Sequence, residues 1–158
     1  MAKGKSKGPP EGPRILNKKA TANFEILERV EAGIALKGTE VKSLRNGHAS
    51  LSEAYARIER GEVVLINFQI EPYKEASFFN HNPKRIKRLL LHKQEIKKLQ
   101  SRVTIKGQTL IPLRVYFNNK GLAKVELALA RGRQTHDKRQ VERKRQDIRD
   151  MARATRRR

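Results

Sequence analysis

Residues 110–130 read LIPLRVYFNNKGLAKVELALA, and this stretch decides the fold. In its second half, apolar side chains alternate with polar or small ones, which is the two-residue period of a strand with one buried face. The two faces carry Val125, Leu127 and Leu129 on one side and Lys124, Glu126 and Ala128 on the other. The turn-forming residues 118–121 (NNKG) separate this strand from the apolar run 110–117, in which Pro112 would suit an edge or a bulge. The stretch therefore predicts two consecutive strands joined by a turn.

Other short runs toward the N-terminus have the composition or the alternation of strands. The predicted strands are residues 24–30 with a continuation over 32–36, 54–59, 63–70 and 102–106. Gly33 interrupts the first of them, and we expect a bulge or a close approach of another backbone there. In the run 63–70, the side chains Val64, Ile66, Phe68 and Ile70 are expected to face one way.

Two helices are expected between these strands. The first opens at Gly38-Thr39, with Thr39 as its N-cap, and ends at Asn46-Gly47. The second begins at Asn82-Pro83, which suit the N-cap and the first helical position. Its apolar positions near helical spacing are Ile86, Leu89, Leu90, Ile96 and Leu99.

About six short strands with two inserted helices predict a mainly β fold with short helices. Closing the sheet into a small antiparallel β-barrel would remove its exposed edges. We expect three segments in this chain. Residues 1–16, rich in Gly, Pro and Lys, form a flexible basic arm, residues 17–130 form the barrel, and residues 131–158 form a basic C-terminal tail.

The charge of the chain is large and concentrated at its ends. The 158 residues carry a formal net charge of +21, and residues 131–158 hold twelve Lys or Arg against four Asp or Glu. The tail has only three sizeable apolar side chains, Val141, Ile148 and Met151, which cannot offset its ordering entropy. We therefore expect the tail to be disordered when free and to order on a polyanion. A disordered solubilising tail is the alternative that composition leaves open.

Composition also excludes several classes of protein. The absence of Cys excludes disulfides, thiolate metal ligands and cysteine nucleophiles. Residues 1–14 carry charge but lack the apolar region of a secretory signal. No apolar run approaches the roughly 20 residues that a membrane-spanning helix needs. We expect a cytoplasmic protein with no membrane partner.

No catalytic constellation is visible in the sequence. The four His lack metal-ligand spacing, so neither a zinc site nor another metal site or cofactor is expected. Residues 33–39 (GIALKGT) come close to a phosphate-binding loop, but Thr39-Glu40 follows the second Gly where Lys and Ser or Thr are required. The carboxylates, Glu40 included, are interpreted as solvated surface charges. Glu31, next to Gly33, is the one carboxylate we single out, because it could accept from a guanine edge or orient an Arg.

The run 84–92 (KRIKRLLLH) has two interpretations. It is either an amphipathic helix with a solvated basic face or a phosphate-binding helix whose N-terminus offers free N–H groups to an anion. The total charge favours the second. The chain has only three Tyr, five Phe and no Trp, which argues against a stacking platform for single strands. Recognition of folded RNA by its shape and phosphates is the better fit.

Several motifs in order resemble the small protein B family, also called the SsrA-binding protein family. They are NKKA at 17–20, EAGIALKGTEVKSLR at 31–45, KRLLLH at 87–92, YF at 116–117, Gly121, KV at 124–125, ALARG at 128–132 and HDKR at 136–139. The resemblance covers residues 17–139 and extends to the basic tail.

The resemblance implies an oligonucleotide-binding-like barrel that binds the tRNA-like domain of transfer-messenger RNA near its elbow. The complex would enter the vacant A site of a ribosome stalled on truncated mRNA, so that the nascent peptide receives a degradation tag. This scheme implies an RNA-binding adaptor, not an enzyme. It also implies a monomer that contacts small-subunit RNA at the A site and in the mRNA channel, and elongation factor Tu indirectly.

The resemblance also assigns candidate residues. Positions implicated in RNA binding are matched by Glu31, Leu90, His92 and Lys124, and His92 departs from members that have Asn there. Polar and basic residues expected on the same RNA-binding surface are Asn17, Lys18, Lys19, Arg45, Lys84, Arg85 and Arg88.

For the tail, the resemblance places His136, Asp137, Lys138 and Arg139 at the decoding centre. Residues beyond them would follow the empty mRNA path, with Arg143, Lys144, Arg145, Ile148 and Met151 as the expected contacts. If residues 140–158 became helical, they would extend about 28 Å at about 1.5 Å per residue.

Two other functions are kept as alternatives. A basic structural ribosomal protein would have the same charged ends but would copurify with all ribosomes. A small RNA-processing enzyme is disfavoured by the lack of a catalytic constellation.

Overall fold

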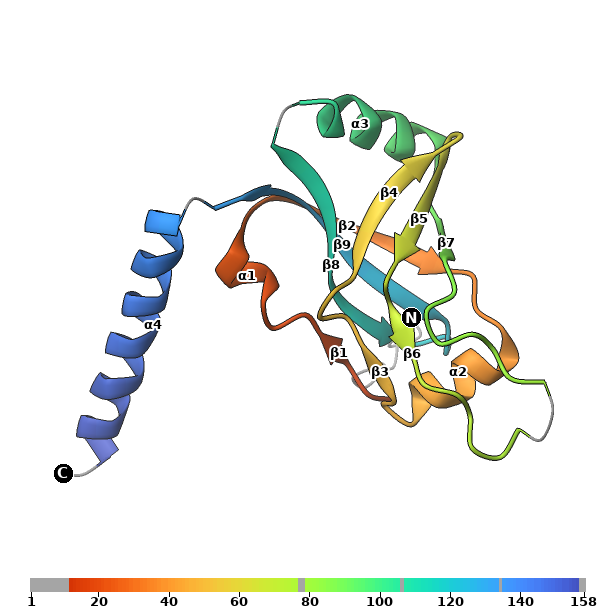
Figure 1. The fold of residues 1–158 in the computed structure, drawn as a ribbon, viewed down its shortest axis with the longest axis horizontal. Helices are drawn as coiled ribbons and strands as arrows, with labels where there is room; N and C mark the ends of the chain where they lie inside the picture. Colours follow the sequence, from red (N-terminus) through yellow and green to blue (C-terminus); the bar gives the residue numbers. More distant parts are fainter. Residues whose placement is uncertain (1–11, 77–78, 106, 134, 157–158) are drawn as a thin grey trace, which may run out of the picture.

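The computed structural model describes residues 12–76, 79–105, 107–133 and 135–156 (Figure 1). Its strands are β1 (Ile15–Leu16), β2 (Phe24–Ile34), β3 (Ala49–Ser50), β4 (Tyr55–Glu59), β5 (Glu62–Ile66), β6 (Gln69–Ile70), β7 (Lys87–Leu90), β8 (Gln108–Phe117) and β9 (Ala123–Gly132). Its helices are α1 (Ala20–Asn23), α2 (Gly38–Arg45), α3 (Lys93–Val103) and α4 (Thr135–Arg156). Most of the predicted basic arm lies outside the described residues, and β1 brings its last two residues into the sheet.

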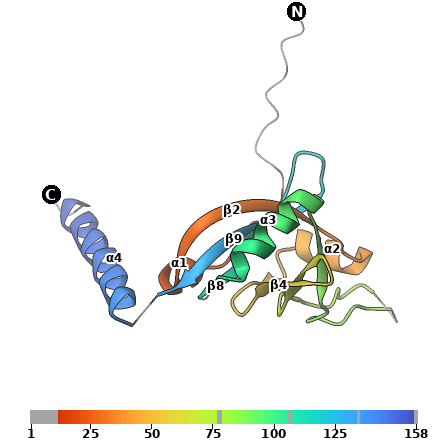
Figure 2. The same ribbon diagram turned by 90° about the horizontal axis from the view of Figure 1, so that it is seen from above.

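Six antiparallel strands form a closed ring in the order β8, β4, β5, β7, β2 and β9, and β9 returns to β8. The stretch at 110–130 supplies the closing hairpin, whose register runs from Leu110 opposite Leu129 to Phe117 opposite Ala123. Strand β2 is long enough to pair with β9 along most of its length and with β7 at its end (Figure 2). This ring confirms the predicted mainly β fold with short helices and a small antiparallel six-stranded sheet.

The interior of the ring is filled by the alternating apolar residues. Val115, Val125 and Leu127 are buried there, in line with the predicted period. Helices α2 and α3 lie at opposite ends of the ring, and each contributes a leucine to the core, Leu44 and Leu99 (Figure 1). Closure of the ring and coverage of its ends together bury one continuous core.

A second, smaller cluster lies on the outside of the ring beneath α1. It contains Ala20 from α1, Ile111 from β8, and Ala128 and Ala130 from β9. The alanines of β9 therefore face outward, and they are small because a helix packs directly on them. This explains why residues 127–130 are buried on both faces of the strand.

Two irregularities shape the outer surface. The register of β8 shifts between Pro112 and Arg114, so Leu113 is the extra residue of a bulge, as the proline predicted. Strand β2 has its shift between Ile26 and Glu28. Gly33 is therefore not a bulge but a point of close approach, since a Cβ placed there would lie 3.3 Å from the Cβ of Leu90.

The predicted facing of residues 63–70 is wrong in its first half. Val63 and Leu65 point into the core, whereas Val64 and Ile66 are only half-buried. Asn67 has φ +59, in the left-handed region, and this residue ends β5 and shifts the alternation by one position. Phe68 and Ile70 are consequently buried, as expected. The buried positions are odd-numbered before Asn67 (Val63 and Leu65) and even-numbered after it.

The predicted helix from Asn82 to Leu99 is half wrong. Residues 87–90 form strand β7, in which Leu89 pairs with Val63 of β5 and Ile34 of β2. The helix begins only at Lys93. Since no helix starts at Asn82, the idea of an anion bound at that N-terminus is also wrong.

Two smaller predictions need correction. The strand expected at 102–106 is not formed at residues 102–105, which are the end of α3, its C-cap Thr104 and the residue after it, and Lys106 lies outside the described residues. Helix α2 has the predicted extent, but its N-cap is Lys37, because the Glu40 side chain accepts from the Lys37 backbone N–H. A C-terminal turn follows at Gly47, with φ +77.

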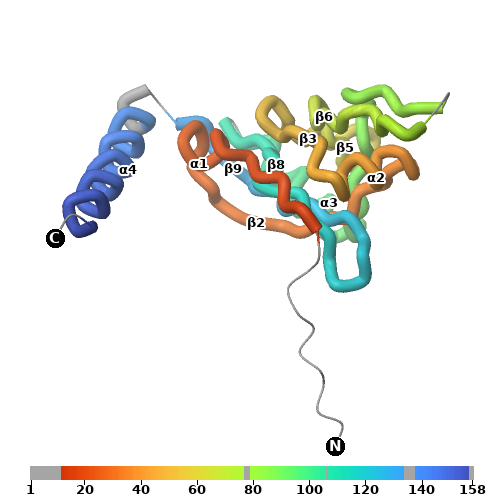
Figure 3. The backbone as a smooth tube through the Cα atoms, turned by 90° about the horizontal axis from the view of Figure 1, so that it is seen from below, coloured from red at the N-terminus to blue at the C-terminus, as the bar shows by residue number. Residues whose placement is uncertain are grey.

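Helix α4 extends away from the ring, and α1, which packs on the outside of the ring, is the element nearest to it (Figures 1 and 3). Among the described residues, one side-chain hydrogen bond joins α4 to the rest of the chain, from Arg145 Nη2 to Thr21 Oγ1 at 2.5 Å. The helix has 22 residues, or about 33 Å at 1.5 Å per residue. Ile148 and Met151 are 67% and 70% exposed, so little burial supports it.

Circular dichroism should test the prediction that the tail is disordered when free. Helix α4 is about as long as α1, α2 and α3 together. A polar helix without tertiary packing is only marginally stable in water. Removing residues 135–158 should therefore leave the total helical signal of the free protein nearly unchanged. A loss of about half of that signal would show that α4 is formed without a partner.

Candidate nucleic-acid interface

The candidate interface centres on Gly33, where three strands meet on the outside of the ring. Gly33 of β2 lies opposite Leu90 of β7 on one side and Lys124 of β9 on the other. Because paired residues share a face of the sheet, the side chains of Leu90 and Lys124 flank the glycine. Leu90 is 55% exposed although it is a large apolar residue on a strand. The absence of a side chain at Gly33 leaves space for Leu90 to lie across it.

Glu31 lies on the same outer face, two residues before Gly33. Its carboxylate accepts a hydrogen bond from the hydroxyl of Tyr116, and Tyr116 lies opposite Lys124 in the β8–β9 hairpin. The structure thus brings together three of the four residues that the family resemblance selected, Glu31, Leu90 and Lys124. Tyr116 joins them, although sequence reasoning used it only as part of a motif.

His92 and Arg88 lie on either side of Leu90 along the chain, and both are exposed. His92 precedes α3, and its backbone N–H donates to Glu95 Oε2 at 3.1 Å. The imidazole therefore lies at a strand-to-helix junction. Arg88 forms an ion pair with Glu62 at 3.2 Å, and both side chains are more than half exposed.

A row of paired charges continues from Glu31 across the outer face. Glu126 accepts from Arg29 Nη1 at 3.2 Å and from Arg114 Nε. The Arg114 guanidinium lies 5.1 Å from the centre of the Tyr116 ring. Sequence reasoning missed both arginines. Their positions on the outward faces of β2 and β8 could have suggested an exposed site. The sequence alone does not give the register in which both strands pair with β9, so it does not show that the two arginines meet.

Asn17, Lys18 and Lys19 lie between β1 and α1. The Asn17 backbone N–H donates to the Leu113 carbonyl at 2.8 Å, and its side-chain amide donates to the Pro112 carbonyl at 3.0 Å. Asn17 therefore ties the start of the domain to the β8 bulge. The two lysines are exposed.

Arg45 and Lys84 are exposed, Arg45 at the end of α2 and Lys84 in the connection between β6 and β7. Arg45, the last residue of α2, lies with its guanidinium 5.7 Å from the Phe117 ring. The Lys84 backbone N–H donates to Asn82 Oδ1 at 3.0 Å, so Asn82 stabilises a turn and does not cap a helix.

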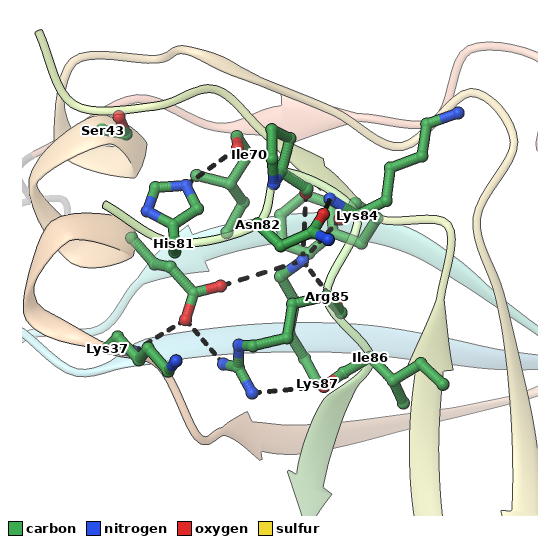
Figure 4. Close-up of polar contacts among 12 residues, drawn as sticks. Lys37, Ser43, Ile70, His81, Asn82, Lys84, Arg85, Ile86 and Lys87 are labelled. Atoms are coloured by element: carbon green, nitrogen blue, oxygen red, sulfur yellow. Dashed lines mark hydrogen bonds and ion pairs between the residues drawn. The ribbon is translucent and has the colours of Figure 1, made fainter. Parts of the chain in front are cut away.

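Arg85 belongs to a buried ion network that the sequence did not reveal (Figure 4). The Glu40 side chain, interpreted above as a surface charge, is fully buried. It accepts from Arg85 Nη2 at 2.6 Å and lies 3.9 Å from the Nζ of Lys87, which is also fully buried. Arg85 also donates to the Ala35 carbonyl at 3.3 Å. Its guanidinium is thus used largely inside the protein.

Lys87 and His81 attach the segment that connects β6 with β7 to helix α2. The Lys87 ammonium donates to the carbonyls of Phe68 at 2.6 Å and Arg85 at 2.9 Å. Burial lowers the pKa of Lys87 to about 8, with Glu40 raising it and Arg85 lowering it further. The buried His81 ring contacts the Ile70 carbonyl at 2.9 Å (Figure 4). It also contacts the hydroxyl of Thr39 at 2.9 Å.

The candidate decoding-centre residues lie in the first turns of α4. The side chains of His136 and Asp137 lie outside the described part of the structure. Lys138 is half-buried, whereas Arg139, Arg143 and Lys144 are exposed. Arg145 contacts Thr21, and Ile148 and Met151 are exposed. Val141, Ile148 and Met151 lie near one stripe of the helix.

The described residues contain no group of three or more His, Asp or Glu placed to hold a metal ion. Among the helices that the structure describes, none is long and apolar enough to cross a bilayer.

Comparison with known proteins gives consistent matches over nearly the whole chain. A family model described as SmpB protein matches residues 14–157. The SsrA-binding protein of Moorella thermoacetica is 53% identical over 142 residues, which is 90% of this chain and 92% of that protein. The SsrA-binding protein of Beijerinckia indica is 56% identical over 130 residues, 82% of each chain. A solved structure described as "tmRNA-SmpB: a journey to the center of the bacterial ribosome" matches with a TM-score of 0.67 and 51% identity, over 78% of this chain and 87% of that one.

Proposed function

The chain belongs to the SmpB protein family, and from this membership we propose that it is an RNA-binding adaptor in trans-translation. It binds the tRNA-like domain of transfer-messenger RNA and delivers that RNA to the vacant A site of stalled ribosomes. The nascent peptide is then tagged and the ribosome is released. The observation that carries this proposal is the likeness to a solved tmRNA–SmpB structure, at 51% identity over most of both chains.

The same likeness supports transfer-messenger RNA and the ribosome as partners. Within the ribosome we propose contacts with small-subunit RNA at the A site and in the mRNA channel, with elongation factor Tu involved indirectly. The protein acts as a monomer in the cytoplasm. Its role is to bind and position RNA, and it catalyses no reaction itself.

We assign RNA capture to the ring and ribosome sensing to the tail. The cluster of Glu31, Leu90 and Lys124 around Gly33 combines a carboxylate acceptor, an exposed apolar side chain and a cation on one face. Such a mixed surface suits the irregular elbow of a folded RNA, which is recognised by shape and phosphates. His92 and Arg88 extend this face along β7. Helix α4, with its exposed cations, suits the phosphate-lined mRNA path.

Copurification separates this proposal from the alternative of a basic structural ribosomal protein. Transfer-messenger RNA should copurify with the protein, and the protein should be enriched on ribosomes stalled on truncated mRNA. Equal, stoichiometric recovery with all ribosomes, without transfer-messenger RNA, would instead support the structural protein.

The affinity for the tRNA-like RNA should fall steeply with salt, because phosphate contacts release counterions. For about five phosphate contacts, the slope of log affinity against log salt should be near −4.5, from about −0.9 per phosphate. A titration of the isolated tRNA-like RNA between about 0.05 and 0.2 M salt measures it. A flat response would place the basic residues of the ring outside the interface.

A further inference from the structure

A cavity of about 330 Å³ opens on the outside of the ring, where β1 and α1 meet β8, β9 and β2. This volume is near the lower end of the roughly 300–1,000 Å³ found for small-ligand sites. The cavity is lined by the charged side chains of Lys18, Arg29, Arg114 and Glu126 and by the apolar side chains of Leu16 and Leu113, among others. It lies beside the RNA-binding face proposed above, because Arg114 contacts Tyr116 and Tyr116 contacts Glu31.

Glu126 holds two arginines of this cavity in place, and most of their N–H donors are not used in these contacts. Glu126, whose side chain is only 13% exposed, accepts one hydrogen bond from each of Arg29 and Arg114. A guanidinium has five N–H donors, and these two side chains remain 61% and 42% exposed. A single carboxylate cannot neutralise two arginines and a lysine. The cavity therefore offers oriented donors and an excess of positive charge to an anion.

The same cavity has an apolar side. Leu16 is 57% exposed and lies opposite Arg114 in the β1–β8 pairing. Leu113 is the extra residue of the β8 bulge. A ligand that fills this space needs one anionic group and one apolar face. A phosphodiester with its attached nucleoside has both, and arginine pairs of this kind bind phosphate oxygens well.

We propose that this cavity binds one nucleotide of the folded RNA, with its phosphate between Arg29 and Arg114 and its sugar or base against Leu16 and Leu113. The inference rests on the proposed RNA-binding function and extends the interface to residues that the sequence did not select. Glu126 is then a positioning residue that holds the two guanidiniums, and the cation of Lys18 supplements them.

The test compares two double variants of the full chain. Arg29→Gln/Arg114→Gln removes the paired cations of the cavity. Arg57→Gln/Arg102→Gln is the matched control, because Arg57 and Arg102 are exposed arginines of β4 and α3 that also pair with glutamates, Glu59 and Glu28. The cavity variant should bind the tRNA-like RNA about tenfold more weakly, with a salt slope less steep by about 1. The control should change affinity by less than about threefold and leave the slope as in the wild type.

A crosslinking measurement covers the possibility that the cavity variant is unstable. A photoreactive residue in place of the exposed Leu16 should crosslink to one nucleotide of the bound RNA. Mapping to no RNA position, or a folded cavity variant with unchanged slope, would overturn the nucleotide site. These outcomes differ from failure of the proposed function, in which the wild-type protein itself would not bind the RNA.

Discussion

Replacing Glu40 with glutamine should lower the free energy of unfolding by about 3–5 kcal/mol, the usual cost of leaving one partner of a buried ion pair alone. The Glu40 carboxylate is fully buried between Arg85 and Lys87, and it also accepts from the Lys37 backbone N–H that starts α2. Glutamine has nearly the same shape, so the change removes the charge without creating a cavity. Urea unfolding monitored by circular dichroism measures the difference.

The loss should depend on pH in a defined direction. Burial lowers the pKa of Lys87 to about 8, below its unfolded value of 10.5, and Glu40 raises it. Without Glu40, the folded-state pKa of Lys87 falls further below its unfolded value, so carrying the Lys87 proton into the folded state costs the variant more than the wild type. As pH rises past about 8, Lys87 loses its proton in the folded wild type as well, and this difference disappears. The stability gap should therefore be wider below pH 8 and should narrow as pH rises above 8.

Two controls identify the mechanism. The double variant Glu40→Gln/Lys87→Met removes the buried charge on both sides and should recover part of the lost stability, because no unpaired buried ammonium remains. The recovery is partial because the carbonyls of Phe68 and Arg85 lose a donor. Glu62→Gln, which breaks the exposed pair with Arg88, should cost less than about 1 kcal/mol. If Glu40→Gln is no more destabilising than Glu62→Gln, the buried network contributes little to stability.

The ring could be predicted from the sequence because its hairpins have patterns that short stretches of the chain contain. The second half of residues 110–130 alternates, and the inward positions Val125, Leu127 and Leu129 are all buried in the structure. Pro112 marked a bulge for a physical reason, since it cannot donate a ladder hydrogen bond. Patterns of this kind depend only on neighbours along the chain.

The segment 82–99 was mispredicted because its pattern fits two structures. Lys87 looks like the polar face of a helix, yet it is a buried strand residue whose charge is balanced by Glu40, 47 positions away. Leu90 looks like a core residue of the same helix, yet it is exposed over Gly33. Only tertiary pairing shows which residues are inside.

The candidate site also contains residues that the sequence could identify and residues that only tertiary pairing brings together. Glu31, Leu90 and Lys124 were selected through motifs, and strand register explains why they share a face. Arg29, Arg114 and Glu126 were not selected, because they come from three strands and no short motif unites them. Their relation exists only after β2, β9 and β8 have paired.

Deleting residues 140–158 should abolish peptide tagging while changing the affinity for the isolated tRNA-like RNA by less than about threefold, or under about 1 kcal/mol. The reason is spatial. The cluster around Gly33 lies on the ring, and among the described residues a single side-chain hydrogen bond joins α4 to the rest of the chain, from Arg145 to Thr21 of α1. Loss of the tail should therefore leave the RNA-binding face intact. Tagging requires more, because the ribosome must accept the complex without a codon.

Two double variants separate the contribution of the tail's charge from that of its apolar stripe. Arg143→Gln/Lys144→Gln keeps the helix but removes two exposed cations, whereas Ile148→Ser/Met151→Ser keeps the charge but removes the exposed apolar stripe. If the tail acts as an ordered helix in a phosphate-lined channel, each pair should reduce tagging, and neither should weaken binding of the isolated RNA. RNA binding that collapses on deletion would instead mean that the tail captures RNA. In that case the basic tail and the ring would form one RNA-binding surface, and the division of roles between them would have to be abandoned.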